Sequence, residues 1–392
     1  MLNFELHLPT HFVFGKGVEL ETGKKVKELG GSHVLVHYGT GSVVRSGLLD
    51  RVVASLKEEG IQVELLGGAI PNPLDTLVYE GIELVRKTGV DFVLGVGGGS
   101  AIDSAKAIAL GAPYDGDFWD FYSYKVVPQA CIPVGVVLTL SGTGSESSNS
   151  SVITQSATRV KRGVNVEVQR PVLAIMNPEL TYTLPPYQTA AGVTDIMSHI
   201  LERYFTNTPD VEVTDRLCEG LLLTVIHAAK LAIREPDNYN ARAQLMWAGT
   251  LAHNNLCGVG RQQDWACHAI EHELSGLYDV AHGAGLAVVT PAWMRYTMHH
   301  NTLRFAQLAE RVWGCSMNYE HPEYTALEGI IRFEHFLRDI GMPVTLKELG
   351  AKAEDIPYLA AHTKMGNAGT HTGYFVPLTP KDVEKVLHLA DK

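Results

Sequence analysis

Apolar runs and amphipathic stretches alternate through the first half of the chain. Mostly apolar runs predict buried strands at residues 33–38, 91–96, 132–138 and 172–176, after a short edge strand at 10–14, and a further strand is predicted at 62–66. Between them, helical periodicity is found at residues 18–29, 43–59, 74–88 and 101–110. Strands that alternate with helices at this spacing are typical of a parallel sheet with helices on both faces.

The pattern becomes helical in the second half. Pro185 and Pro186 interrupt the chain, and the long amphipathic stretches beyond them have the period of a helix. The predicted helices are 188–205, 211–234, 239–256, 265–277, 283–298, 302–312, 323–337 and 380–390. Pro291 should start, kink or end its helix. We therefore expect an α/β domain at residues 1–185 and an all-helical domain at residues 186–392.

Composition narrows the class of protein. The chain has 392 residues, of which 45% are apolar, which is enough for two packed domains. A net charge of -11 without any Lys/Arg-rich run argues against a nucleic-acid surface. No run of 18 apolar residues occurs, so no membrane span is expected. The five cysteines are widely spaced and lack a C-x-x-C pair, which favours reduced thiols in the cytoplasm.

A glycine-rich junction follows the strand at 91–96. Gly97, Gly98, Gly99 and Ser100 separate it from a helix start, so bare backbone N–H groups and the helix dipole form an anion site suited to a pyrophosphate. A side chain there would hold the phosphate away. Ser100 stands where the usual dinucleotide fingerprint has its last glycine, which favours a Rossmann-like relative of that domain. The alternative is a simple tight turn.

Two further features bear on a nucleotide. Asp103 lies on the first turns of the following helix, where it could accept from a ribose or amide or serve as an N-terminal charge. A second loop, Thr139-Leu140-Ser141-Gly142-Thr143-Gly144-Ser145, ends the strand at 132–138 and offers the hydroxyls that a nucleotide's second half needs.

The residues after the strand at 33–38 indicate which nicotinamide cofactor is used. Enzymes that prefer NAD usually have an acid here for the ribose 2′-OH. This chain has Gly39-Thr40-Gly41-Ser42 with Arg45 close by, so a 2′-phosphate would be accommodated. NADP(H) is therefore the hypothesis.

A cluster of metal-ligand residue types occupies the helical half. Asp195 and His199 are four apart and share one helix face, as do His268 and His272, and His282 follows a helix stop. One carboxylate with several imidazoles is a typical donor set for a divalent cation. The alternative is that these histidines never meet. Among the others, His253 could approach the site.

The motifs together resemble the iron-dependent (group III) alcohol dehydrogenase family, within the dehydroquinate synthase-like fold. The resemblance covers essentially the whole chain and rests on THFVFGKG, GVGGGSAIDSAKAIA, TLSGTGSESS, MNPELTYTLPP, GVTDIMSH and HAIEH through the His282-Gly283 pair. YGTGS, LTLSGTGSES and QDWACHAIEHEL look closest to the butanol dehydrogenase and aldehyde reductase branch, which favours NADPH.

The resemblance implies roles for individual residues. The metal ligands would be Asp195, His199, His268 and His282, while His272 would stand near the nicotinamide and substrate, outside the metal shell. The residues implied to hold the cofactor are Gly97, Gly98 and Ser100 at the pyrophosphate, Thr139, Leu140, Thr143 and Ser145 along the adenosine and nicotinamide path, Lys161 at the ribose, and Gly39, Thr40 and Ser42 at the 2′-phosphate.

The expected activity is hydride transfer between NADP(H) and a small primary alcohol or aldehyde such as butanol or butanal, with a metal in the interdomain cleft polarising the substrate oxygen. Fe²⁺ suits the ligands and Zn²⁺ competes for them. The edge strand at 10–14 suggests a homodimer. Alternatives are an NAD-dependent polyol dehydrogenase, a metal lyase of the dehydroquinate synthase kind, and a nucleotide sensor with a structural metal.

Overall fold

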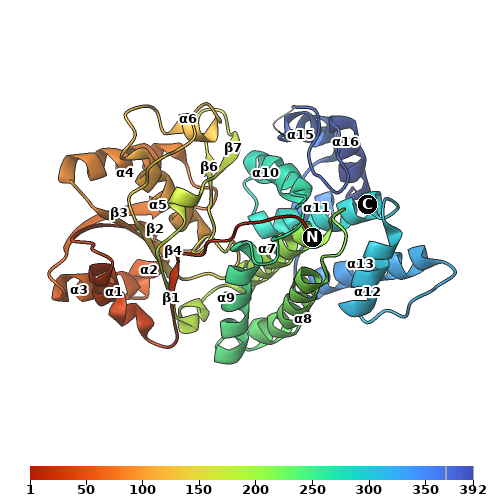
Figure 1. The fold of residues 1–392 in the computed structure, drawn as a ribbon, viewed down its shortest axis with the longest axis horizontal. Coiled ribbons are helices and arrows are strands. Elements are labelled where there is room, and N and C mark those ends of the chain that lie inside the picture. Colours follow the sequence, from red (N-terminus) through yellow and green to blue (C-terminus); the bar gives the residue numbers. More distant parts are fainter. Residues whose placement is uncertain (367–368, 392) are drawn as a thin grey trace. The chain divides into compact units, whose positions relative to one another are not determined.

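The computed structural model describes residues 1–366 and 369–391 and divides into two compact units (Figure 1). One comprises His7–Thr183, and the other comprises Leu184–Lys392 together with Met1–Leu6. The sequence predicts that the first six residues are part of the α/β domain, whereas the structure groups them with the helical unit. The backbone explains this difference, because the Leu2 N–H donates to the Gly260 carbonyl at 2.7 Å.

Within the described residues of the α/β unit, six strands form one sheet in the order β1-β8-β5-β4-β2-β3. Each neighbouring pair is parallel, as predicted. The strands are β1 (His11–Phe14), β2 (His33–Gly39), β3 (Gln62–Ala69), β4 (Phe92–Gly97), β5 (Val134–Leu138) and β8 (Leu173–Met176). Because β2, β4 and β5 are neighbours and run the same way, the loops after them meet at one edge of the sheet.

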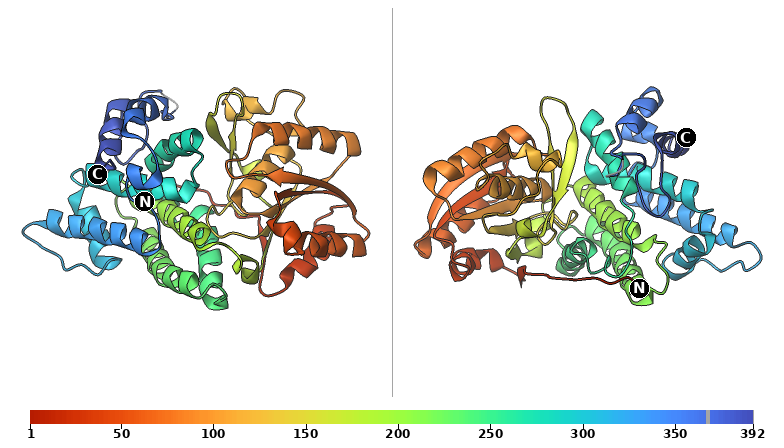
Figure 2. Two further views of the ribbon diagram at one scale, coloured as in Figure 1. Left: turned by 180° about the vertical axis from the view of Figure 1, so that it is seen from behind. Right: turned by 45° about the horizontal axis from the view of Figure 1, so that its top comes forward.

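Helices cover both faces of this sheet (Figures 1 and 2). Alternate strand residues point to opposite faces. Leu35 packs with α4 and α5 on one face, whereas Val34 and Val36 pack with α1 and α3 on the other. The helices are α1 (Thr22–Glu28), α2 (Ser42–Arg45), α3 (Leu48–Glu58), α4 (Asp75–Thr88), α5 (Gly99–Gly111) and α6 (Trp119–Tyr122), with short 3₁₀ turns η1 (Val18–Glu21), η2 (Glu167–Gln169) and η3 (Pro178–Thr181).

Among the local differences from the sequence prediction, one concerns a helix and one a hairpin of the α/β unit. The single helix expected at 43–59 is split into α2 and α3, because Gly47 adopts φ 69°, a left-handed conformation that interrupts a helix. An antiparallel hairpin of β6 (Ser150–Thr154) and β7 (Lys161–Asn165) was not predicted. Its strands are rich in serine and charged residues, so they lack the apolar signal of a buried strand.

The other unit is helical, as expected (Figure 1). Its helices are α7 (Pro186–Tyr204), α8 (Glu212–Arg234), α9 (Tyr239–His253), α10 (Ala266–Tyr278), α11 (His282–Thr297), α12 (Thr302–Arg311), α13 (Pro322–Asp339), α14 (Leu346–Leu349), α15 (Ile356–His362) and α16 (Pro380–Leu389), with η4 (Ala353–Asp355). Helix α7 is buried on all sides from Thr189 to Tyr204 and packs against α8, α9 and α11. Helix α11 continues through Pro291, so this proline neither starts nor ends it. Among the described residues, no helix combines the length and apolar character that a bilayer span requires.

Candidate functional site

Three helices carry the predicted metal-ligand residues. Asp195 and His199 lie one turn apart on the buried helix α7. His268 is on the first turn of α10, which begins directly after Trp265 in a left-handed conformation with φ 73°. His282 is the first residue of α11. The tertiary packing of α7, α10 and α11 therefore decides whether these side chains meet.

The structure brings all four side chains together around one carboxylate oxygen. Oδ1 of Asp195 lies 3.5 Å from Nδ1 of His199 and 3.6 Å from Nε2 of both His268 and His282. The ligand atoms of Asp195, His268 and His282 all lie within 4.8 Å of one another. His199 joins this group next to Asp195 and by stacking on His268, with ring centroids 4.7 Å apart.

The chemistry of this cluster fits a divalent cation. Within the described part of the chain, Asp195 Oδ1, His199 Nδ1 and His268 Nε2 are buried and have no hydrogen-bond partner. An unsatisfied buried polar atom costs about 1–3 kcal/mol, so three converging ones require a common partner. Ligands arranged tetrahedrally at about 2.1 Å from an ion lie about 3.4 Å apart, which is close to the observed separations. These residues can therefore hold one cation.

The ionisable groups of the cluster differ sharply in proton affinity. Burial, together with the neighbouring His253, places the pKa of His199 well below its usual value. Burial also acts to lower the pKa of His268, but Glu202 and Asp195 outweigh it and raise that pKa to about 10. A proton and a cation therefore compete for His268, because a metal binds only the neutral ring.

Side chains outside the predicted ligand set surround the cluster. The His272 ring lies 5.6 Å from that of His282 and 6.5 Å from that of His268 (centroid distances). Its ligand atom forms a separate close group with Glu271 and His282 that excludes Asp195. His253 stacks on His199 at 4.0 Å with 18° between the rings. No sequence spacing pointed to that stack, because His253 lies on another helix.

Two buried glutamates were also missed by the sequence prediction. Nδ1 of His268 contacts Oε2 of Glu202, and Nδ1 of His282 contacts Oε2 of Glu271. A local signal for Glu202 existed, since Asp195, His199 and Glu202 occupy positions i, i+4 and i+7 of one helix face. For Glu271 there was no such signal, because its partner is on the next helix.

The predicted phosphate loop joins β4 to α5 in the α/β unit. Gly98 precedes α5 and Gly99 is its first residue. A Cβ on Gly98 would lie 3.1 Å from Cβ of Leu140, and one on Gly99 would overlap the side chain of Thr143. The glycines thus allow the loop at 139–145 to pack directly on this turn. The expected reason for these glycines, room for a phosphate, stays a prediction beside this one.

Asp103 and Lys106 on α5 bind the loop at 139–145 and the start of strand β6 by hydrogen bonds. The Asp103 carboxylate accepts from the Ser145 hydroxyl at 2.5 Å and from the Val152 N–H at 2.9 Å. Lys106 donates to Ser145 Oγ at 2.9 Å and to the Ser150 carbonyl at 2.8 Å. Burial lowers the pKa of Lys106 to about 8. Asp103 and Ser145 are therefore already engaged in holding the second loop in position.

The other cofactor candidates occupy the loop after β2 and the hairpin. Gly39 ends β2, while Thr40 and Ser42 are exposed on the way into α2. A Cβ on Gly41 would lie 2.7 Å from Nη1 of Arg45, so the guanidinium folds back over this loop. Lys161 on β7 is buried and donates to Oδ1 of Asn72 at 2.9 Å. The loop after β2 contains no acid, and the guanidinium group of Arg45 on α2 lies beside it.

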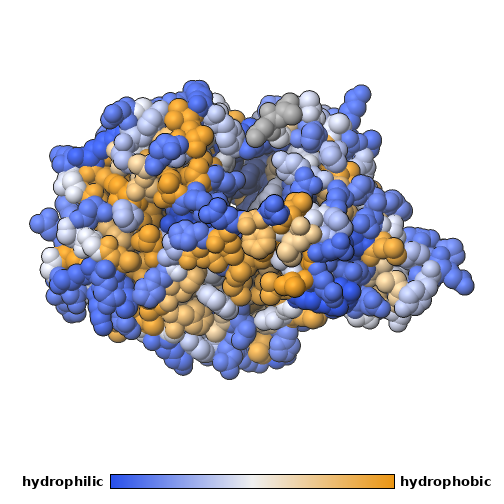
Figure 3. Space-filling view, in the orientation of Figure 1, coloured by the Kyte–Doolittle hydropathy of each residue, from blue (hydrophilic) through white to orange (hydrophobic). Residues whose placement is uncertain are grey.

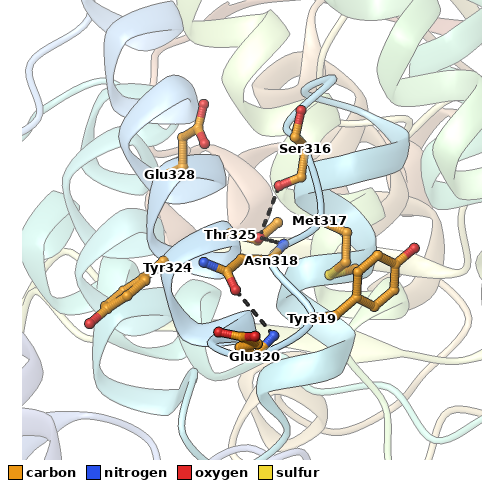
Figure 4. A pocket seen from close by; sticks show the side chains of 8 residues that line it. All are labelled: Ser316, Met317, Asn318, Tyr319, Glu320, Tyr324, Thr325 and Glu328. Carbon is orange, nitrogen blue, oxygen red and sulfur yellow. Dashed lines mark hydrogen bonds between the residues drawn. The ribbon is translucent and has the colours of Figure 1, made fainter.

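A surface hollow beside the α12–α13 connection contains no comparable chemistry (Figure 4). Its central polar groups are used internally, since Thr325 Oγ1 accepts from the Asn318 N–H at 2.8 Å and donates to the Ser316 carbonyl at 3.1 Å. The surface of this projecting region is mostly hydrophilic, at the far right of Figure 3. These contacts order the connection, and no residue that lines the hollow belongs to a group of described side chains that could hold a metal ion.

Both the α/β unit and the helical unit match models of one known protein family. Residues 9–178 match the family model described as iron-containing alcohol dehydrogenase, and residues 189–390 match the Fe-containing alcohol dehydrogenase family, C-terminal. The chain is 41% identical over 387 residues to NADH-dependent butanol dehydrogenase A of Clostridium acetobutylicum, covering 98% of this chain and 99% of that relative. It is 39% identical to the NADPH-dependent aldehyde reductase YqhD of Escherichia coli, covering 92% of each.

Solved structures give the same result. The crystal structure of NADH-dependent butanol dehydrogenase A from Thermotoga maritima superposes with a TM-score of 0.97 at 41% identity, covering 100% of this chain and 99% of that one. The structure of YqhD from Escherichia coli superposes with a TM-score of 0.94 at 36% identity, covering 99% of both chains. The predicted fold class and the predicted resemblance are both confirmed, and the chain belongs to the iron-containing alcohol dehydrogenase family.

Proposed function

We propose that this protein is a metal-dependent oxidoreductase that transfers a hydride between NADP(H) and a small primary alcohol or aldehyde, such as butanol or butanal. The observation that carries the proposal is the convergence of three unsatisfied buried atoms on Asp195, His199 and His268, beside His282. The names of the related butanol dehydrogenases and aldehyde reductase support the substrate class.

The helical unit supplies the chemistry at the substrate oxygen in this proposal. Asp195, His199, His268 and His282 would hold the cation, Fe²⁺ first and Zn²⁺ as the competitor, and no thiolate is among them. When bound, the cation supplies Lewis acidity toward an alcohol or aldehyde oxygen, and the nicotinamide supplies the hydride chemistry. His272 would deliver or remove the proton of the hydroxyl group from its position beside His282.

The α/β unit would bind the nucleotide. The N–H groups of Gly97, Gly98, Gly99 and Ser100 at the start of α5 suit a pyrophosphate. Thr139, Leu140 and Thr143 would line the path of the nucleoside halves. Asp103 and Ser145 would act by shaping that loop, since they already bond to each other. Lys161 would reach the ribose from the hairpin.

Preference for NADP(H) over NAD(H) is the finer part of the proposal. Gly39, Thr40 and Ser42 offer no carboxylate to a 2′-phosphate, and Arg45 lies over the same loop. The names of relatives point both ways, with NADH in the butanol dehydrogenases and NADPH in the aldehyde reductase. The structural argument for NADPH is the cation near the loop after β2.

The test combines metal analysis with cofactor kinetics. Protein loaded with Fe²⁺ or Zn²⁺ should oxidise NADPH in the presence of butanal, and the metal-free protein should not. A higher kcat/KM with NADPH than with NADH would support the cofactor preference, and the reverse order would overturn it. Failure of the metal-loaded protein to oxidise either cofactor with any short aldehyde would refute the proposed activity.

Two further aspects are proposed with the function. Strand β1 lies at the edge of the sheet beside β8, and pairing through an edge strand is a common way to form a homodimer. Light scattering during size-exclusion chromatography tests this. A cytoplasmic location is proposed as well, because the five cysteines are widely spaced and lack a C-x-x-C pair.

A further inference from the structure

The carboxylate of Glu202 makes two contacts with His268. Oε1 of Glu202 accepts from the backbone N–H of His268 at 3.1 Å, and Oε2 contacts Nδ1 of the same ring. Glu202 is 1% exposed and His268 is 7% exposed, so water does not replace this interaction. The carboxylate thus binds the first turn of α10 and the imidazole together.

His282 has an equivalent partner from a different helix. Its Nδ1 contacts Oε2 of Glu271, which is fully buried on α10. A Cβ on Gly285 would lie 2.7 Å from Cγ of Glu271, so the glycine one turn into α11 makes room for this side chain. The contact between α10 and α11 is therefore shaped around the glutamate.

Both contacts determine which ring nitrogen faces Asp195. A neutral imidazole carries one N–H, and a carboxylate beside Nδ1 fixes that proton there. The lone pair is then on Nε2, which in both rings lies 3.6 Å from Asp195 Oδ1. His199 is held differently, because its ring is stacked between those of His253 and His268.

We propose that Glu202 and Glu271 are positioning residues that fix His268 and His282 as Nδ1-protonated, Nε2-donating ligands and thereby set the affinity and geometry of the metal site. The inference rests on the metal site of the proposed function. It goes beyond that function by assigning a role to two side chains outside the four proposed ligands.

Metal affinity measured without turnover tests the proposal. Purified full-length protein is stripped of metal, and Co²⁺ or Zn²⁺ is titrated against a chelator of known affinity. Glu202→Gln and Glu271→Gln should each weaken binding by about 10–100-fold. The Co²⁺ absorption bands should shift in both variants, because a ring that is free to rotate changes the ligand field. Restoring a carboxylate with Glu202→Asp should recover part of the affinity.

Glu219→Gln is the matched control. Glu219 is a buried glutamate of the same unit, 4% exposed, which contacts Arg311, Arg216 and the Tyr204 hydroxyl. Its substitution should lower stability while leaving the Co²⁺ spectrum and the metal affinity unchanged. A general effect of losing a buried charge would instead weaken metal binding in all three variants, and this result would overturn the proposal.

The remaining outcomes are also decisive. Wild-type affinity and an unchanged Co²⁺ spectrum in both Gln variants would refute the positioning role. If Glu202→Gln does not fold, Glu271→Gln decides the question, because its partner His282 is the more exposed of the two, at 24% of its side chain. Lack of dehydrogenase activity in the wild type would refute the proposed function but would leave the affinity result intact.

Discussion

The Gly283→Ala substitution tests whether the close approach of two helices creates the metal site. A Cβ built on Gly283 would lie 1.9 Å from the carbonyl oxygen of Ala191 on α7. Real Cβ contacts are essentially never shorter than 3.0 Å, so the start of α11 has to move by about 1.1 Å. The obstacle is backbone, which cannot rotate away as a side chain would.

That movement is large compared with the tolerance of the site. His282 adjoins Gly283, and its Nε2 is 3.6 Å from Asp195 Oδ1. A shift of about 1.1 Å can separate the two atoms by up to about 4.7 Å, whereas one ion with bonds of about 2.1 Å spans at most about 4.2 Å. We therefore expect loss of His282 from the ligand set, with a destabilisation of about 1–3 kcal/mol from overpacking.

Metal content per chain and chelator competition measure the first effect, and thermal unfolding measures the second. Gly220→Ala on α8 is the control, because the added methyl group has no heavy atom within 4 Å apart from its own stretch of helix. It should stabilise the protein by up to about 1 kcal/mol and leave metal content unchanged. Stoichiometric metal bound with wild-type affinity by Gly283→Ala would show that the approach of α11 to α7 does not control the site.

Three other substitutions test the remaining assignments. His272→Ala should lower kcat by about 10²–10⁴-fold with metal content unchanged, because the residue is proposed to move a proton; loss of metal would place it among the ligands. Burial lowers the pKa of His37 from 6.5 to about 4. Below pH 6.5 His37 therefore binds a proton in the unfolded chain but not in the folded chain. The free energy of unfolding should fall by about 3 kcal/mol between pH 7 and 4. Urea unfolding at several pH values should show a smaller decrease of the unfolding free energy with falling pH for His37→Asn than for the wild type. An identical pH dependence in the two proteins would contradict the low pKa of His37. Lys106→Met removes the hydrogen bonds that the ammonium group donates to Ser145 and Ser150. It should weaken NADPH binding by at least about 10-fold in fluorescence titrations and leave the metal affinity unchanged. Unaltered NADPH affinity would show that the loop at 139–145 keeps its shape without Lys106.

Local patterns in the sequence determined much of the α/β unit. Continuous apolar runs such as 91–96 specify strands buried on both faces, and the helices between them leave a parallel sheet as the packing solution. The hairpin at 150–165 has no continuous apolar run. Its strand β6 packs against α5, and a buried hydroxyl group of this strand is satisfied by a hydrogen bond. Sequence periodicity reports which side of an element is apolar, and it reports little where polar side chains are buried.

For the metal site, the sequence by itself determined which residues share a helix face. Asp195 with His199, and His268 with His272, follow from a spacing of four. Only the tertiary structure decided that α7, α10 and α11 approach closely enough at Gly283 for four ligands to meet, and that Glu202 and Glu271 stand behind two of them. The reason is physical: spacing along a helix is set by its 3.6-residue turn, whereas the distance between helices is set by the side chains packed between them.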